Sequence, residues 1–134
     1  MEFRPRVDAD RTIGLTLAGD LLCIGLFVAL GVLRHPESTP LYVRVPETAA
    51  PFIAGWLLVG AFFGTFTAES LVGTRTVALR AGVAWLGADL LAQAARATPF
   101  VAGGVAPAFV VVSLVTGGAF LVGWRTVVAR TLTG

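Results

Sequence analysis

Two aspartates stand inside long apolar segments of this 134-residue chain, and their chemistry is the first question that the sequence raises. Asp20 lies in the hexapeptide LAGDLL at 17–22, and Asp89 lies in a near copy, LGADLL, at 86–91. An aspartate at the centre of a membrane-spanning helix costs about 2.5–3.5 kcal/mol on insertion scales. Each carboxylate must therefore be protonated, paired or hydrated, and the chemistry on offer is the binding of a proton or small cation.

Asp89 shares one helix face with three other residues that can form polar contacts. Trp85, Gln93 and Arg96 lie at helical spacing from it, on a segment otherwise rich in alanine. Because lipid cannot satisfy these groups, we expect the stripe to face the interior of a helix bundle. Gln93 could then bridge Asp89 to Arg96.

Asp20 lies about 12 Å along its own helical segment, measured from the expected cytoplasmic edge. Arg80 and Arg125, both expected near that edge, are its candidate cations. Two interpretations stay open for both aspartates. In the first, the aspartates line a polar cavity that binds a cation or proton. In the second, they hold the bundle together through arginine or hydroxyl partners.

His35 and Cys23 are weaker candidates for a functional site than the two aspartates. His35 follows the first apolar segment at about 22 Å from Asp20 along the helix, so it belongs to a separate outer site, as a loop-capping residue or a proton carrier. The single cysteine excludes an intrachain disulfide, and no second His or Cys gives metal-ligand spacing. Hydrolase, nucleotide-binding and metalloprotease motifs are absent from the sequence. We therefore expect no enzyme activity, metal or cofactor.

The composition is that of an integral membrane protein. Hydrophobic residues make up 56% and charged residues 13% of the chain, against about 25% charged in soluble domains, and the mean hydropathy is +0.84. All ten basic residues are arginines, and they lie between the apolar segments rather than on one polar face. The expected partner is the lipid bilayer, and nucleic acid is not.

The apolar segments predict an all-α, four-helix membrane bundle that forms one domain over 1–134. Prolines 36, 40 and 46 predict a loop between the first two helices, on the outer side of the membrane. Seven arginines fall on the side of both termini and three on the other side, which places the termini in the cytoplasm of a multi-pass cell-membrane protein. The predicted boundaries are about 12–33, 51–71, 77–97 and 104–124 for the spans, and 34–50 for the loop.

The chain resembles DUF3054, a family of small prokaryotic four-span membrane proteins classified only as a domain of unknown function. The resemblance covers about 12–127 and implies the fold and the location, but no reaction or substrate. Asp89 has no counterpart in it. The residues that carry it are Asp20, Phe27, Gly31 and His35, then Pro51, Phe52, Gly55 and Trp56, then Arg96, and finally Gly123, Trp124 and Arg125.

The resemblance also implies an arrangement of these motifs. His35, the 51–56 motif and Arg96 would gather on the outer face, where Trp56 could stack on Arg96 or His35. Trp124 and Arg125 would anchor the cytoplasmic end of the last helix, as residues of an aromatic belt with basic flanks do.

These observations favour a small proton- or ion-linked transporter or channel-like protein with its polar site at Asp20. Its candidate polar pathway consists of Asp20, Asp89, Gln93, Arg96 and His35. A second hypothesis is a non-transporting membrane partner or assembly subunit that binds another protein through glycine and aromatic faces, among them Gly60 and Gly64. A membrane enzyme acting on lipid is a third. A homo-oligomer, most simply a dimer, is expected because four spans enclose little volume. The paired hexapeptides admit an internal duplication, although their flanking residues do not match.

Overall fold

The computed structural model describes residues 10–34, 38–101 and 104–131, and His35 lies outside these ranges. Within them the chain is helical and contains no β-strand, which confirms the all-α prediction. The last long helical segment is continuous over Pro107–Thr131 and includes one π-helical turn. The elements are α1 (Arg11–Leu33), α2 (Leu41–Phe62), the short 3-10 helix η1 (Ala68–Leu71), α3 (Thr74–Arg96), α4 (Pro107–Val112), the π-helical turn η2 (Ser113–Gly117) and α5 (Gly118–Thr131).

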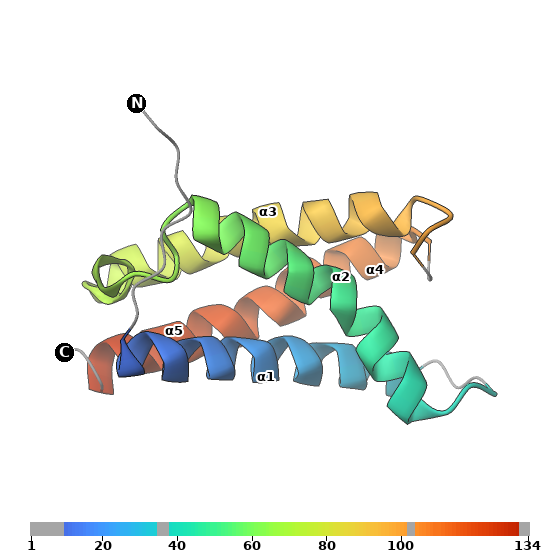
Figure 1. The fold of residues 1–134 in the computed structure, drawn as a ribbon, viewed down its shortest axis with the longest axis horizontal. Helices are drawn as coiled ribbons and strands as arrows, with labels where there is room; N and C mark the ends of the chain where they lie inside the picture. Colours follow the sequence, from blue (N-terminus) through green and yellow to red (C-terminus); the bar gives the residue numbers. More distant parts are fainter. Residues whose placement is uncertain (1–9, 35–37, 102–103, 132–134) are drawn as a thin grey trace.

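The long helices form a four-membered bundle (Figure 1). α1 packs against α2 on one side and α5 on the other, and α3 packs against the same two helices, so α1 and α3 are diagonal partners. The start of α1, the connection between α2 and α3, and the end of α5 lie together at one end of the bundle. Side chains from all four long segments therefore meet along a single interior.

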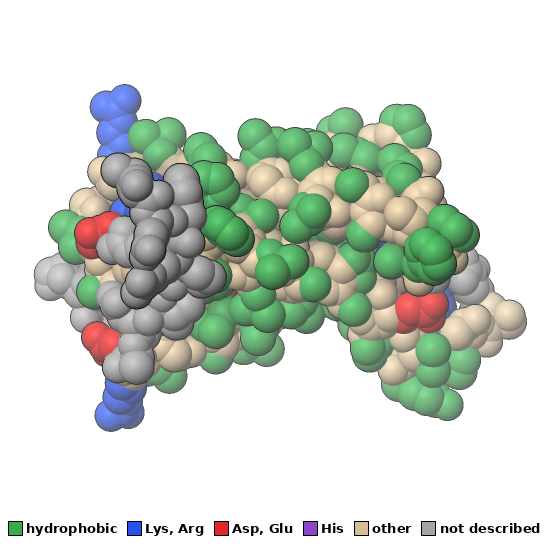
Figure 2. Space-filling model, turned by 45° about the horizontal axis from the view of Figure 1, so that its top comes forward, with side chains coloured by type: hydrophobic (Ala, Val, Ile, Leu, Met, Phe, Trp, Pro, Cys, Tyr) green, Lys and Arg blue, Asp and Glu red, His purple; other side chains and the backbone are tan. Residues whose placement is uncertain are grey.

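Among the residues that the structure describes, three helices are long and apolar enough to cross a membrane: α1, α2 and the continuous Pro107–Thr131 segment. α3 matches them in length with 23 residues, but it carries Arg75, Arg80, Asp89 and Arg96. Figure 2 shows hydrophobic side chains over the middle of the visible face and charged side chains toward its two ends. This surface fits contact with the hydrocarbon core of a bilayer.

The predicted outer loop over 34–50 and the second span over 51–71 are wrong in their boundaries. α2 begins at Leu41, continues through Pro46 and Pro51, and ends at Phe62. A proline inside a helix removes one backbone hydrogen bond and bends the axis, but a helix packed against its neighbours tolerates it. Figure 1 shows α2 bending along its length.

The other boundaries are closer to prediction. α1 and α3 differ from the predicted 12–33 and 77–97 by no more than three residues at either end. The last segment keeps Pro107 in its first turn, where the missing N–H costs nothing, but it continues to Thr131 instead of ending near 124. Arg125 consequently lies within a helix and not in a flanking segment.

Candidate functional site

α1 places Asp20 in the bundle interior. The Asp10 carboxylate caps the helix by accepting from the Thr12 N–H at 2.9 Å, which satisfies one of the free donors of the first turn. Thr16, Asp20 and Phe27 then fall on its buried face at helical spacing. Asp20 is completely buried.

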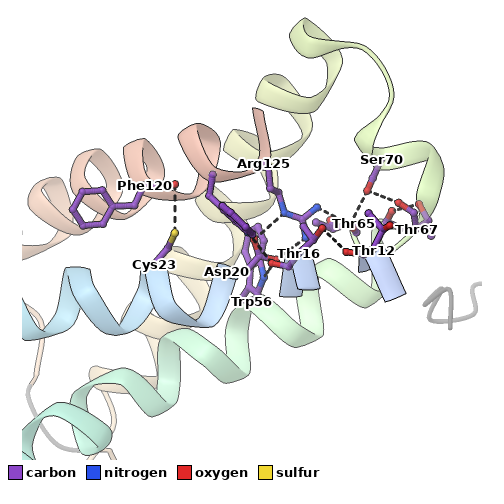
Figure 3. Close-up of polar contacts among 12 residues, drawn as sticks. Thr12, Thr16, Asp20, Cys23, Trp56, Thr65, Thr67, Ser70, Phe120 and Arg125 are labelled. Atoms are coloured by element: carbon purple, nitrogen blue, oxygen red, sulfur yellow. Dashed lines mark hydrogen bonds and ion pairs between the residues drawn. The ribbon is translucent and has the colours of Figure 1, made fainter. Parts of the chain in front are cut away.

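Arg125 of α5 neutralises Asp20 (Figure 3). Its Nε donates to Asp20 Oδ1 at 3.1 Å and its Nη2 donates to Oδ2 at 2.6 Å, which is the two-pronged geometry that fits a guanidinium to a carboxylate. Trp56 of α2 donates its indole N–H to Oδ2 at 3.2 Å. Arg125 is 2% exposed. Three helices thus contribute to one buried ion pair, and Arg125, one of the two candidate cations, is the partner.

The turn that follows α2 accepts a hydrogen bond from the third nitrogen of the Arg125 guanidinium. Arg125 Nη1 donates to the Thr65 carbonyl at 2.8 Å, and the Ser70 hydroxyl lies 2.8 Å from the same oxygen. Gly64 adopts a φ of 70°, a left-handed conformation that glycine reaches without strain and that ends α2. Thr67 donates back to the Gly64 carbonyl at 2.6 Å. Gly64 therefore shapes this turn and is not part of a helix-packing face.

Asp89 of α3 is also completely buried, but its partners are neutral. Its Oδ2 lies 2.7 Å from the Ser113 hydroxyl, and its Oδ1 accepts from Gln93 Nε2 at 3.2 Å. Within the described residues, Asp89 makes no ion pair. Gln93 Oε1 is buried there without a hydrogen-bond partner. The two aspartates thus occupy different chemical environments.

The π-helical turn η2 presents Ser113 to Asp89. Such a turn pairs each N–H with the fifth residue back, which disturbs the regular pattern and leaves carbonyls open to other donors. The Trp85 indole N–H donates to the Ser113 carbonyl at 3.0 Å. A Cβ on Gly117 would lie 2.5 Å from Trp85 Cζ2, so only glycine lets the indole lie against the turn.

A layer of aromatic side chains lies inside the bundle with the two carboxylates. Its ring centroids stand 5.4–6.3 Å apart in edge-to-face, stacked and tilted pairs. Trp56 reaches from this layer to Asp20, and Trp85 reaches from it to the Ser113 turn. The two polar sites are therefore joined through indole rings. The layer consists of Phe27, Phe52, Trp56, Trp85 and Phe109.

Arg96 does not bridge to Asp89 through Gln93 as predicted. Gln93 bonds Asp89 and Ser113, while Arg96 Nε donates to the Gly104 carbonyl at 3.2 Å and its guanidinium lies 4.7 Å from the centre of the Phe109 ring. The proposed outer contacts of His35 lie outside the described residues.

The 51–56 motif lies within α2 and approaches Arg96 only through Phe109, whose ring contacts both Phe52 and the Arg96 guanidinium. Pro51 lies inside α2, and Phe52 belongs to the aromatic layer. A Cβ on Gly55 would lie 2.6 Å from the Ala88 carbonyl oxygen, so this glycine brings α2 and α3 together. Trp56 bonds Asp20 instead of stacking on Arg96 or His35, because α2 starts earlier than predicted and places Trp56 deeper in the bundle.

Only part of the 123–125 motif is interior: Arg125 is buried, Trp124 is half-buried and Gly123 is exposed. The Trp124 indole donates to the Thr16 carbonyl at 2.9 Å and lies on Gly19, where a Cβ would overlap the ring. Arg125 forms its ion pair with Asp20. A Cβ on Gly123 would meet nothing within 4 Å. Cys23 is half-buried, and its thiol donates to the Phe120 carbonyl at 3.5 Å.

Two contributors are not identified by the sequence as site residues. Ser113 stands out only as a small residue, although a hydroxyl near mid-helix opposite an aspartate is a signal for a polar contact. The Thr65 carbonyl gives no sequence signal at all, since it is a backbone atom in a turn.

A cavity of about 320 Å³ lies nearby, between Phe63, Thr65, Leu79, Arg80, Val83 and Ala84, and neither aspartate lines it. No group of three or more potential metal ligands occurs among the described residues.

Comparison with known proteins gives one match. The family described as "Protein of unknown function (DUF3054)" matches residues 17–128, which include both aspartates and span every helix of the bundle in whole or in large part. No curated protein and no solved structure matches the chain.

Proposed function

This chain belongs to the DUF3054 family, and we propose that it is a small four-span transporter of the cell membrane that moves a proton or small ion and uses Asp89 as the binding group. The observation that carries the proposal is the difference between the two buried carboxylates. Asp20 has a full complement of charged and polar partners, so it holds the bundle together. Asp89 is hydrogen-bonded only by neutral donors, and Arg96 interacts with it through space without forming an ion pair among the described residues. A buried carboxylate without an ion pair inside a membrane bundle is a candidate site for a mobile cation or proton.

The surroundings of Asp89 support this role. π-helical turns occur frequently at functional sites, and here one holds the Ser113 hydroxyl against the carboxylate. Gln93 Oε1, buried and unpartnered, supplies a further acceptor in the same place. Most buried polar groups in proteins have a hydrogen-bond partner, so an unpaired acceptor beside a buried carboxylate is consistent with a binding role.

The four-span topology is part of the proposal, with α3 as the fourth span. Its outward residues are apolar and exposed, as lipid contact requires, and its polar residues Asp89, Gln93 and Arg96 are buried. Those outward residues include Leu79, Val83, Leu86 and Leu90.

The arginine distribution supports cytoplasmic termini. One end of the bundle carries Arg11, Arg75, Arg80 and Arg130, and the other carries Arg34, Arg44 and Arg96. The richer end faces the cytoplasm under the positive-inside rule, and it is the end where α1 begins and α5 stops. Exposed leucines and valines over the surface also leave room for a second copy, so a homodimer belongs to the proposal.

The test is ion flux through protein reconstituted in liposomes. Wild-type vesicles carrying an internal pH dye are expected to respond to an imposed proton or cation gradient, and Asp89→Asn is expected to abolish the response. Glu47→Gln, the same carboxylate-to-amide change at an exposed position of α2, is the matched control and should keep full flux.

Two results would refute the proposal. Folded wild-type protein that gives no flux under any gradient would favour the partner role, and undiminished flux in a folded Asp89→Asn variant would remove Asp89 from the pathway. Helical content and a monodisperse elution profile establish that each variant is folded.

A further inference from the structure

The cavity between the end of α2 and the first turns of α3 opens on the outer surface of the bundle. Three apolar side chains at its edge, Phe63, Leu79 and Val83, are 66%, 59% and 64% exposed. In the proposed topology this surface faces the bilayer, so the cavity, with a volume of about 320 Å³, is open to lipid.

Arg80 supplies the only charge among the described residues that line this cavity. Its Nη2 donates to the Phe63 carbonyl at 3.3 Å, and it makes no ion pair within the described part of the chain. A guanidinium carries five N–H donors, so most of them are free to meet an anion. Arg80 lies about 9 Å along α3 from Thr74, a depth from which an arginine extends its charged group to the level of the lipid headgroups.

We propose that this cavity binds one anionic phospholipid of the cytoplasmic leaflet. The phosphate would lie at Arg80, and an acyl chain would lie against Phe63, Leu79 and Val83. Basic pockets between membrane helices on the cytoplasmic side bind anionic headgroups, and no acidic side chain lines this one among the described residues. The proposal goes beyond the transport function and takes from it only the four-span topology.

The cavity adjoins the turn that supports the Asp20–Arg125 pair. Thr65 lines the cavity, and its carbonyl accepts from Arg125 Nη1 at 2.8 Å (Figure 3). Two arginines thus hold carbonyls on either side of Gly64, Arg80 at Phe63 and Arg125 at Thr65. A lipid bound at Arg80 contacts the same turn, so its binding should raise the stability of the folded bundle.

Native mass spectrometry of the detergent-solubilised protein tests the site. The probes are phosphatidylglycerol and phosphatidylcholine with identical acyl chains. We expect the wild type to bind phosphatidylglycerol about fivefold more tightly or better, and Arg80→Gln to lose that preference. Arg75→Gln is the matched control, since Arg75 is an exposed arginine of the same helix outside the cavity, and it should keep most of the preference.

A second variant tests the acyl-chain part of the cavity while the charge is kept. Val83→Trp places a large ring at the cavity edge and should weaken phosphatidylglycerol binding about as much as Arg80→Gln does. Leu90→Trp is its control, because Leu90 is exposed two helical turns further along the same face of α3 and does not line the cavity.

Three results would overturn the lipid assignment. The first is an unchanged phosphatidylglycerol preference in folded Arg80→Gln or Val83→Trp. The second is an equal loss in Arg75→Gln, which would point to surface charge in general. The third is competition by glycerol phosphate at the concentrations at which the lipid binds, which would indicate a site for a soluble anion.

The lipid site and the transport function fail separately. A selective lipid site in a protein without flux would support this proposal and refute transport alone. Flux that depends on Asp89 in a protein without lipid preference would refute this proposal alone.

Discussion

Breaking the Asp20–Arg125 pair should cost more stability than any other single polar change in the described part of the bundle. Arg125→Met removes both bonds to the carboxylate and the bond to Thr65, and it leaves Asp20 with the Trp56 indole alone. Loss of one partner from a buried pair typically costs about 3–5 kcal/mol, since the remaining charge stays uncompensated. Asp20→Asn should cost somewhat less, because the guanidinium keeps the Thr65 carbonyl and its contacts with the rings of Trp56 and Phe66.

The double variant distinguishes an ion pair from two independent contacts. With both charges removed, Asp20→Asn/Arg125→Met leaves no isolated buried charge, so its cost should fall short of the sum of the single costs by about 2–3 kcal/mol. The measurement is the free energy of unfolding in mixed micelles titrated with sodium dodecyl sulfate and followed by tryptophan fluorescence. Arg130→Met, an exposed arginine on the same helix, is the control and should change stability by about 0.5 kcal/mol at most.

Additive single costs, to within about 0.5 kcal/mol, would refute the reasoning, because residues joined by two hydrogen bonds must couple. An Arg130→Met loss equal to that of Arg125→Met would refute it as well, since the effect would then follow from any arginine at this end of α5.

The remaining predictions concern close packing at two glycines. Gly117→Ala should destabilise the bundle by about 1–3 kcal/mol and alter the Trp85 fluorescence, because the new Cβ would meet the indole at 2.5 Å. Gly55→Ala should cost a similar amount, since its Cβ would meet the Ala88 backbone carbonyl, which cannot rotate away. Gly123→Ala is the control for both, because its Cβ would enter open space, and it should be neutral or slightly stabilising by detergent unfolding. Equal losses in all three variants would contradict the packing argument.

Some of the site is predictable from the sequence for simple physical reasons. Arg125 is one of the two arginines that the sequence places at the same end of the bundle as Asp20, and Gln93 stands one helical turn from Asp89. Contacts of this kind depend on helix periodicity and on the high cost of an unpaired charge. Both follow directly from residue type and spacing along the chain.

The other contacts of the site depend on where the helices begin and end. Proline chemistry predicts that α2 starts at Pro51, but the helix starts at Leu41, which puts Trp56 about 22 Å from its beginning instead of near an outer edge. That shift turns Trp56 from an expected partner of Arg96 into a partner of Asp20. The π-helical turn has no sequence signal that distinguishes it from a regular helix, so the pairing of Ser113 with Asp89 is not predictable from periodicity.

Arg125 and Ser113, the partners of the two buried aspartates, are made late in the synthesis of the chain. Arg125 lies 105 residues after Asp20, and Ser113 lies 24 residues after Asp89, so both partners arrive with the segment Pro107–Thr131. In the proposed four-span topology, the first three long helices are made and inserted while both carboxylates still lack these partners. The last segment completes both sites at once, and nascent chains that stop before it should be substrates for membrane quality control.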